Sequence, residues 1–101
     1  LEVKPNSRNV VPGETFFTID LRHPEMPVLE DMEAEIRRAF DATLRELDLT
    51  GTLTRIWEQP PVAFDATCLD AIRSAVARTG FNARDIVSGA GHDAVYVSRV
   101  T

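Results

Sequence analysis

The chain has 101 residues, of which 44% are hydrophobic and 27% charged, so it is long enough for one globular domain with a core and is not a disordered chain. The formal net charge of −5 argues against nucleic acid as a partner, because nucleic-acid binders carry a basic surplus. We expect no membrane contact and no leader, because no apolar run approaches the roughly 20 residues of a membrane helix. The single cysteine, Cys68, can form no internal disulfide and favours a cytoplasmic location.

The N-terminal part of the chain is typical of two strands joined by a polar loop. Residues 1–3 alternate apolar and charged side chains, and Pro5 ends this ladder because it has no N–H to donate. Residues 14–22 form the clearest strand, with apolar side chains on one face and polar side chains on the other. At its end, the planar guanidinium of Arg22 can hold a carboxylate with two hydrogen bonds. From the residues alone, a salt bridge between Arg22 and Asp20 is the favoured interpretation.

The middle of the chain holds the clearest helix, predicted over residues 28–47. Its apolar side chains recur at helical spacing and should pack the first part of the chain: Leu29, Met32, Ile36, Phe40, Leu44 and Leu47. The β-forming residues at 52–58 predict another strand. The pair Pro60-Pro61 then breaks the pattern and is the best candidate for a domain boundary.

A second helix is predicted over residues 66–79, beyond this boundary. Asp65 is a suitable N-cap, and Gly80 fits the left-handed position that ends a helix. Cys68 lies within this helix, and we expect it to be a small buried apolar residue rather than a nucleophile. The glycine-containing loop at 88–94 then leads into a further helix start.

Two polar residues in loops are candidate ligand contacts, but neither is convincing by itself. His92 can donate a hydrogen bond or transfer a proton near neutral pH, although a solvent-facing turn histidine is the favoured interpretation from this loop alone. Asn9 can donate an amide hydrogen bond, although Asn in such loops more often bonds its own backbone. The two histidines, His23 and His92, lie far apart without paired carboxylates, so this chain offers no metal site.

Three segments, taken in order, resemble one known family. They are Pro-Asn-Ser-Arg-Asn-Val-Val-Pro-Gly at 5–13, Phe-Thr-Ile-Asp-Leu-Arg-His-Pro at 17–24 and Ser-Gly-Ala-Gly-His-Asp-Ala at 88–94. Together they resemble the later half of the hydantoinase/carbamoylase amidases, which are M20-type metal-dependent hydrolases. This family includes N-carbamoyl-L-amino-acid hydrolases, allantoate amidohydrolases and β-ureidopropionases.

The resemblance implies an α+β fold that is divided between two bodies. Residues 1–59 would be the second half of an inserted lid and dimerisation domain, in which helices pack on antiparallel strands. Residues 60–101 would be a helical segment that returns to the α/β catalytic domain. The chain would then be a fragment of a longer protein, which forms a homodimer through its lid.

The resemblance also implies a reaction and a set of substrate contacts. The parent would hydrolyse the ureido C–N bond of an N-carbamoyl amino acid or a related linear ureide such as allantoate. Arg22 would bind the substrate carboxylate, while Asn9 and His92 would orient the rest of the substrate and His23 would be structural. Two divalent ions (zinc, manganese or cobalt) would act in the parent, with their ligands and the catalytic glutamate outside this chain. The chain alone would therefore bind no metal and be inactive.

Two other interpretations remain open. One is a non-catalytic dimerisation module, which would pair through the strand at 15–22. The other is an M20-type aminoacylase or dipeptidase, against which the loop at 88–94 argues because it is closer to the carbamoylase branch. Paired metal-binding motifs elsewhere in the open reading frame would separate an enzyme from a module.

Overall fold

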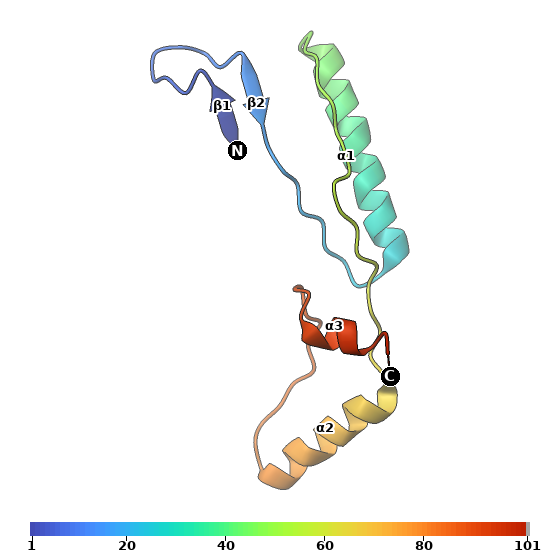
Figure 1. The fold of residues 1–101 in the computed structure, drawn as a ribbon. Coiled ribbons are helices and arrows are strands. Elements are labelled where there is room, and N and C mark those ends of the chain that lie inside the picture. Colours follow the sequence, from blue (N-terminus) through green and yellow to red (C-terminus); the bar gives the residue numbers. More distant parts are fainter. Residues whose placement is uncertain (101) are drawn as a thin grey trace.

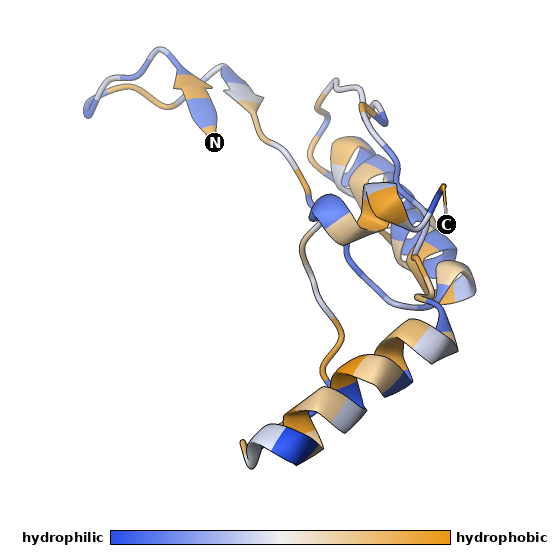
Figure 2. Ribbon diagram, turned by 60° about the horizontal axis from the view of Figure 1, so that its bottom comes forward, coloured by the Kyte–Doolittle hydropathy of each residue, from blue (hydrophilic) through white to orange (hydrophobic). Residues whose placement is uncertain are grey.

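The computed structural model describes residues 1–100 and is elongated (Figure 1). It measures 62 × 31 × 24 Å, with a Cα radius of gyration of 20.9 Å, whereas a compact chain of this length has a radius of gyration of about 13 Å. None of the described residues is buried, and Figure 2 shows hydrophobic residues along all three helices rather than in one interior. The expectation that this chain buries its own core is therefore wrong for the described residues.

The chain begins with a small antiparallel hairpin. Strand β1 (Glu2–Lys4) pairs with β2 (Glu14–Phe16), with Lys4 directly opposite Glu14. The Nζ atom of Lys4 lies 2.8 Å from a carboxylate oxygen of Glu14. The N–H of Gly13 donates to the carbonyl of Lys4 at 2.8 Å and closes the loop at 5–13.

Both longer predicted strands differ from the structure. The strand expected at 14–22 ends at Phe16, and the strand expected at 52–58 is absent from the described chain. Both segments are extended in Figure 1, but the only strand pairing among residues 1–100 is that of β1 with β2, so neither segment has a partner strand there. Side-chain alternation favours an extended backbone, whereas a strand also needs a neighbour that completes its ladder.

Helix α1 (Met26–Glu46) forms almost where the apolar spacing predicts it. Pro27 lies in the first turn, where the missing N–H costs no helical hydrogen bond. Five of the six stripe residues are partly covered, while Leu47 follows the helix and is 59% exposed. The extended segment at 51–58, called the return segment below, runs back along this helix (Figure 1). It approaches the helix closely at Gly51, where an added Cβ would lie 3.0 Å from Phe40 and 3.3 Å from Leu44.

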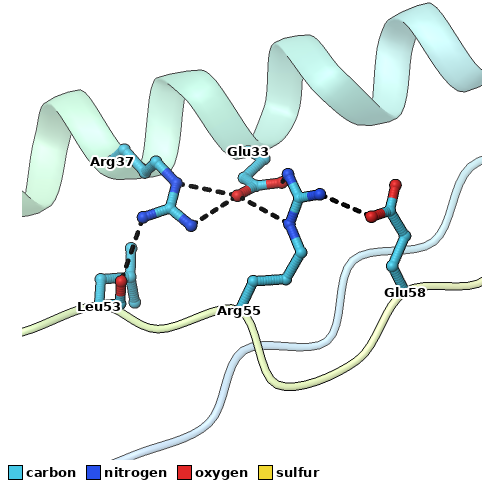
Figure 3. Close-up of polar contacts among 5 residues, drawn as sticks. All are labelled: Glu33, Arg37, Leu53, Arg55 and Glu58. Carbon is cyan, nitrogen blue, oxygen red and sulfur yellow. Dashed lines mark hydrogen bonds and ion pairs between the residues drawn. The ribbon is translucent and has the colours of Figure 1, made fainter.

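A network of charged side chains fastens α1 to the return segment (Figure 3). Glu33 accepts a hydrogen bond from Nε of Arg37 at 2.8 Å, and it forms an ion pair with Arg55. Arg37 also donates to the carbonyl of Leu53 at 3.1 Å, and Arg55 pairs with Glu58 at 2.6 Å. The hydrogen bonds from Arg37 and Arg55 hold the pKa of Glu33 below its ordinary value.

The second part of the chain starts with α2 (Ala66–Thr79), which has the predicted bounds. A carboxylate oxygen of Asp65 accepts from the N–H of Cys68 at 3.1 Å, and Gly80 ends the helix with φ 73°. Cys68 is exposed, which contradicts the expectation that it is buried, because no other element packs over this helix.

The two long helices do not pack against each other. Within the described chain the only pair of elements in contact is β1 with β2, so Ile72 and Val76 of α2 do not meet the apolar stripe of α1. A short helix, α3 (Asp93–Val97), follows the glycine loop. No helix in residues 1–100 is both long enough and apolar enough to cross a bilayer.

Candidate functional site

The loop before α3 is shaped by its own hydrogen bonds. The hydroxyl of Ser88 accepts from the N–H of Ala90 at 3.3 Å and lies 3.0 Å from the carbonyl of Ala90. His92 is the residue before the helix, with an extended backbone (φ −147°, ψ 176°). Its side chain is exposed and makes no capping hydrogen bond to α3.

An aromatic ring from a different segment covers one face of this histidine. The rings of Phe64 and His92 are stacked, with centroids 5.9 Å apart and planes inclined by 22°. Phe64 is partly buried and comes directly before Asp65, the N-cap of α2. The stack therefore joins the start of α2 to the start of α3.

Arg22 reaches the same loop from the first part of the chain. One of its terminal nitrogens, Nη1, donates to the carbonyl of Gly89. Its Nε and Nη2 atoms hold the carboxylate of Asp20 at 2.9 and 2.5 Å. The hydrogen bond from Arg22 lowers the pKa of the Asp20 carboxyl, and the same contact raises the pKa of the guanidinium.

The structure thus shows the salt bridge between Arg22 and Asp20 that the residues alone favour, and adds a long-range contact with Gly89 that the sequence did not predict. The loop at 88–92 brings together two residues that are far apart in the sequence: His92 lies at its end, and Arg22 binds its backbone at Gly89. A guanidinium and an imidazole in this arrangement can hold a carboxylate and orient a polar group next to it. Both groups can donate hydrogen bonds, so the arrangement is suited to binding a polar ligand.

Asn9 is not brought to this loop. It lies in the connection between β1 and β2, which both ribbon views show at the far end of the hairpin from α3. The backbone N–H of Asn9 is 3.5 Å from the hydroxyl of Ser7. The second histidine, His23, is used locally, since its Nδ1 accepts from the N–H of Glu25 at 3.0 Å just before α1.

Two parts of this site are not recognisable in the sequence as members of it. Phe64 follows Pro60-Pro61 and precedes a helix, and nothing in this local pattern indicates a contact with His92. The carbonyl of Gly89 is a backbone group and has no sequence signal at all. Both contacts depend on how distant segments meet, so only the tertiary structure reveals them.

The described residues build no metal centre beside this loop. In residues 1–100, no three His, Cys, Asp or Glu side chains are grouped closely enough to hold a metal ion. The residues present therefore do not fit the two-metal centre that the resemblance implies. An open groove of about 210 Å³ lies instead along α1, between Leu29, Ile36 and the segment at 53–59.

Comparison with curated proteins identifies relatives over nearly the whole chain. An N-carbamoyl-L-amino-acid amidohydrolase of Rhizobium meliloti is 35% identical over 96 residues, which are 95% of this chain and 23% of that protein. One of Paenarthrobacter aurescens is 35% identical across 100% of this chain and 24% of its own length. An allantoate amidohydrolase of Escherichia coli (strain K12) is 35% identical across 99% of this chain and 25% of its own length.

The chain thus spans about a quarter of the length of the curated relatives it matches. No family model and no solved structure matches it.

Proposed function

We propose, from the premise that this chain belongs to the family of the N-carbamoyl-L-amino-acid and allantoate amidohydrolases, that the whole protein hydrolyses a ureido C–N bond. The observation that carries the proposal is the 35% identity to relatives with these two names across 95% or more of the chain. Water adds to the ureido carbonyl, and the bond from this carbon to a nitrogen breaks. With an N-carbamoyl amino acid, this first cleavage leaves a carbamic acid. The carbamic acid then loses carbon dioxide as its remaining C–N bond breaks, so the final products are the amino acid, ammonia and carbon dioxide.

In this proposal the chain supplies substrate contacts. Arg22 binds the substrate carboxylate, and His92 orients the ureido group beside it. The position of both residues at the loop of 88–92 supports these roles. Asp20 already occupies two donors of Arg22, so a substrate carboxylate takes the place of the Asp20 carboxylate there. Asn9 can contact the same substrate only if the loop between β1 and β2 moves closer to the loop at 88–92 than it lies in this structure.

The remaining parts of the proposal concern the whole protein. The divalent metal ions implied by the resemblance would be held by residues outside the described range, because residues 1–100 do not build their site. The division into a lid half at 1–59 and a catalytic segment at 60–101 is supported by the absence of packing between α1 and α2. We propose a homodimer through the lid, which the outer edges of the two-stranded hairpin can support by pairing. The lone cysteine supports a cytoplasmic location.

Ammonia release by the full-length protein tests the proposed activity. The substrates are N-carbamoyl amino acids, allantoate and 3-ureidopropionate, and we expect at least one of them to release ammonia with saturable kinetics. The Arg22→Ala variant should be strongly impaired, whereas Arg38→Ala, which changes an exposed arginine of α1, should not be. Failure on every ureide, together with cleavage of N-acyl amino acids or dipeptides, would assign the protein to the aminoacylase or dipeptidase alternative.

A further inference from the structure

The stack between Phe64 and His92 is a contact for which the proposed function has no role yet. Its geometry, with 5.9 Å between centroids and 22° between planes, lies within the range of favourable aromatic pairs. The two residues come from different segments, one before α2 and one before α3. The contact therefore fixes the relative position of these two segments as well as of the two rings.

Phe64 is well placed to act as a fixed surface. The residue after it, Asp65, is bound to the first turn of α2 through the N–H of Cys68. The residues before it include Pro60-Pro61, whose rings restrict the backbone. A side chain held between a restricted segment and a capped helix loses little further freedom when another ring stacks on it.

His92 needs such a surface because its side chain has few other restraints. Arg22 binds the loop backbone at Gly89, but this hydrogen bond does not involve the imidazole. The imidazole is exposed, and it does not cap α3. The stacked Phe64 ring then selects among the side-chain rotamers of His92 while both ring nitrogens stay accessible.

We propose that Phe64 is a positioning residue that holds the imidazole of His92 in the orientation used to contact the substrate. This inference rests on the proposed function only for its last step, the contact with substrate. The position of the ring itself is a property of the protein without substrate. The two steps can therefore be tested separately.

The first test measures the imidazole without any substrate. Diethyl pyrocarbonate acylates imidazole nitrogens, and peptide mass spectrometry of the full-length protein gives separate rates for His92 and His23. We expect Phe64→Ala to raise the rate at His92 by about three- to tenfold, the range that corresponds to loss of an aromatic pair. Phe64→Tyr, which keeps an aromatic ring at this position, should leave the acylation rate of His92 as it is in the unmodified protein. The matched control is Phe81→Ala, which changes an exposed phenylalanine after α2 and should alter neither rate.

An unchanged rate at His92 in Phe64→Ala would overturn the inference. An equal rise at His92 and His23 would also overturn it, because the variant would then have loosened the protein as a whole. Neither result depends on whether the protein hydrolyses a ureide.

The second test measures ammonia release from the best ureide substrate. We expect Phe64→Ala to lower kcat/KM by about three- to tenfold, Phe64→Tyr to retain the activity and Phe81→Ala to leave it unchanged. A rate change at His92 without any change in kcat/KM would reject the positioning role. If no ureide is hydrolysed by the unmodified protein, the proposed function fails, while the acylation rates still decide whether Phe64 holds His92.

Discussion

Arg22 carries out two tasks with one guanidinium group. Its contact with Asp20 is local, across two positions of the chain, whereas its contact with Gly89 joins the two parts of the molecule. Asp20 and a substrate carboxylate each have two oxygens that can accept hydrogen bonds from the guanidinium of Arg22. In the proposed function, substrate binding at Arg22 would exchange one carboxylate for another, and the planar shape of the guanidinium would be essential to this exchange.

Replacing Arg22 by Lys keeps the charge but removes the two-pronged hydrogen bonding. We expect Arg22→Lys to lower kcat/KM for a ureido acid by about ten- to a hundredfold, and Arg22→Ala to lower it further. The fold should survive, because this side chain is exposed. Steady-state ammonia release from the full-length protein provides the measurement.

The matched N-carbamoyl amine, which lacks the carboxylate, is the contrast substrate for this prediction. The unmodified protein should hydrolyse it poorly, and Arg22→Ala should make this little worse. If the substitution impairs both substrates equally, or unfolds the protein, Arg22 is a structural partner of Asp20 instead.

Helices α1 and α2 are stabilised by different kinds of interaction. The long helix is fastened to the return segment by the ion pairs of Glu33 and by the close approach at Gly51. The shorter helix is defined by its ends, with a carboxylate cap at Asp65 and a left-handed glycine at Gly80. A low pH, which protonates Glu33, should therefore weaken the contact between α1 and the segment at 51–58. A residue with a Cβ in place of Gly80 should destabilise the C-terminal end of α2.

The Glu33 network predicts a pH-dependent contribution to stability. Hydrogen bonds from Arg37 and Arg55 lower the folded-state pKa of Glu33, so its contribution is complete above the ordinary carboxyl pKa of about 4.3. It is lost as the pH falls through the folded-state value. We expect Glu33→Gln to lower the thermal midpoint of the full-length protein by about 1–3 °C at pH 7, with the difference vanishing toward pH 3. Glu35→Gln, which changes an exposed carboxylate of α1, is the control and should leave the thermal midpoint at pH 7 unchanged.

Gly80 allows a prediction about the end of α2. Its φ of 73° is strained for residues with a Cβ, although no atom would clash with that Cβ within 4 Å. Gly80→Ala should therefore destabilise the full-length protein by about 1 kcal/mol, purely through backbone conformation. Gly80→Asn should be milder, because Asn tolerates this region better. Thermal or urea unfolding measures both variants, and equal stability of Gly80→Ala and the unmodified protein would contradict the assignment.

Exposed apolar surface is the main property of the whole molecule. Ile56 and Trp57 are 84% and 74% exposed, and Ile86 is 83% exposed. Burial of such side chains is the dominant favourable term in folding, and the described residues do not supply it to one another. The relatives are about four times as long as this chain, and the rest of a protein of that length would offer surface to cover these residues.

We expect the isolated 101-residue chain to lack cooperative unfolding and hydrolase activity. Differential scanning calorimetry should show no sharp transition, because none of the described residues forms a buried core that would melt as a unit. Titration with zinc or manganese should show no stoichiometric tight binding, since residues 1–100 bring no three ligands together. A sharp calorimetric transition, or micromolar binding of two metal ions per chain, would contradict this expectation.

The sequence by itself determined the features that depend on near neighbours. Helical spacing located α1, and the Asp65 cap and Gly80 set the ends of α2, because their partners lie within one helical turn. Strand alternation was less informative. The sequence predicted strands at 14–22 and 52–58, but only residues 14–16 are paired, because the ladder that makes a strand requires a partner that no local pattern specifies.

The tertiary structure alone decided which distant groups meet. Arg22 contacts the carbonyl of Gly89, and Phe64 stacks on His92, although neither pair shares a turn, a helix or a strand. It also decided that Cys68 is exposed. Apolar character states only that a side chain favours burial, whereas the surface that covers it belongs to another segment. Burial and long-range contacts are therefore properties of how segments are placed in space, which spacing along the chain does not encode.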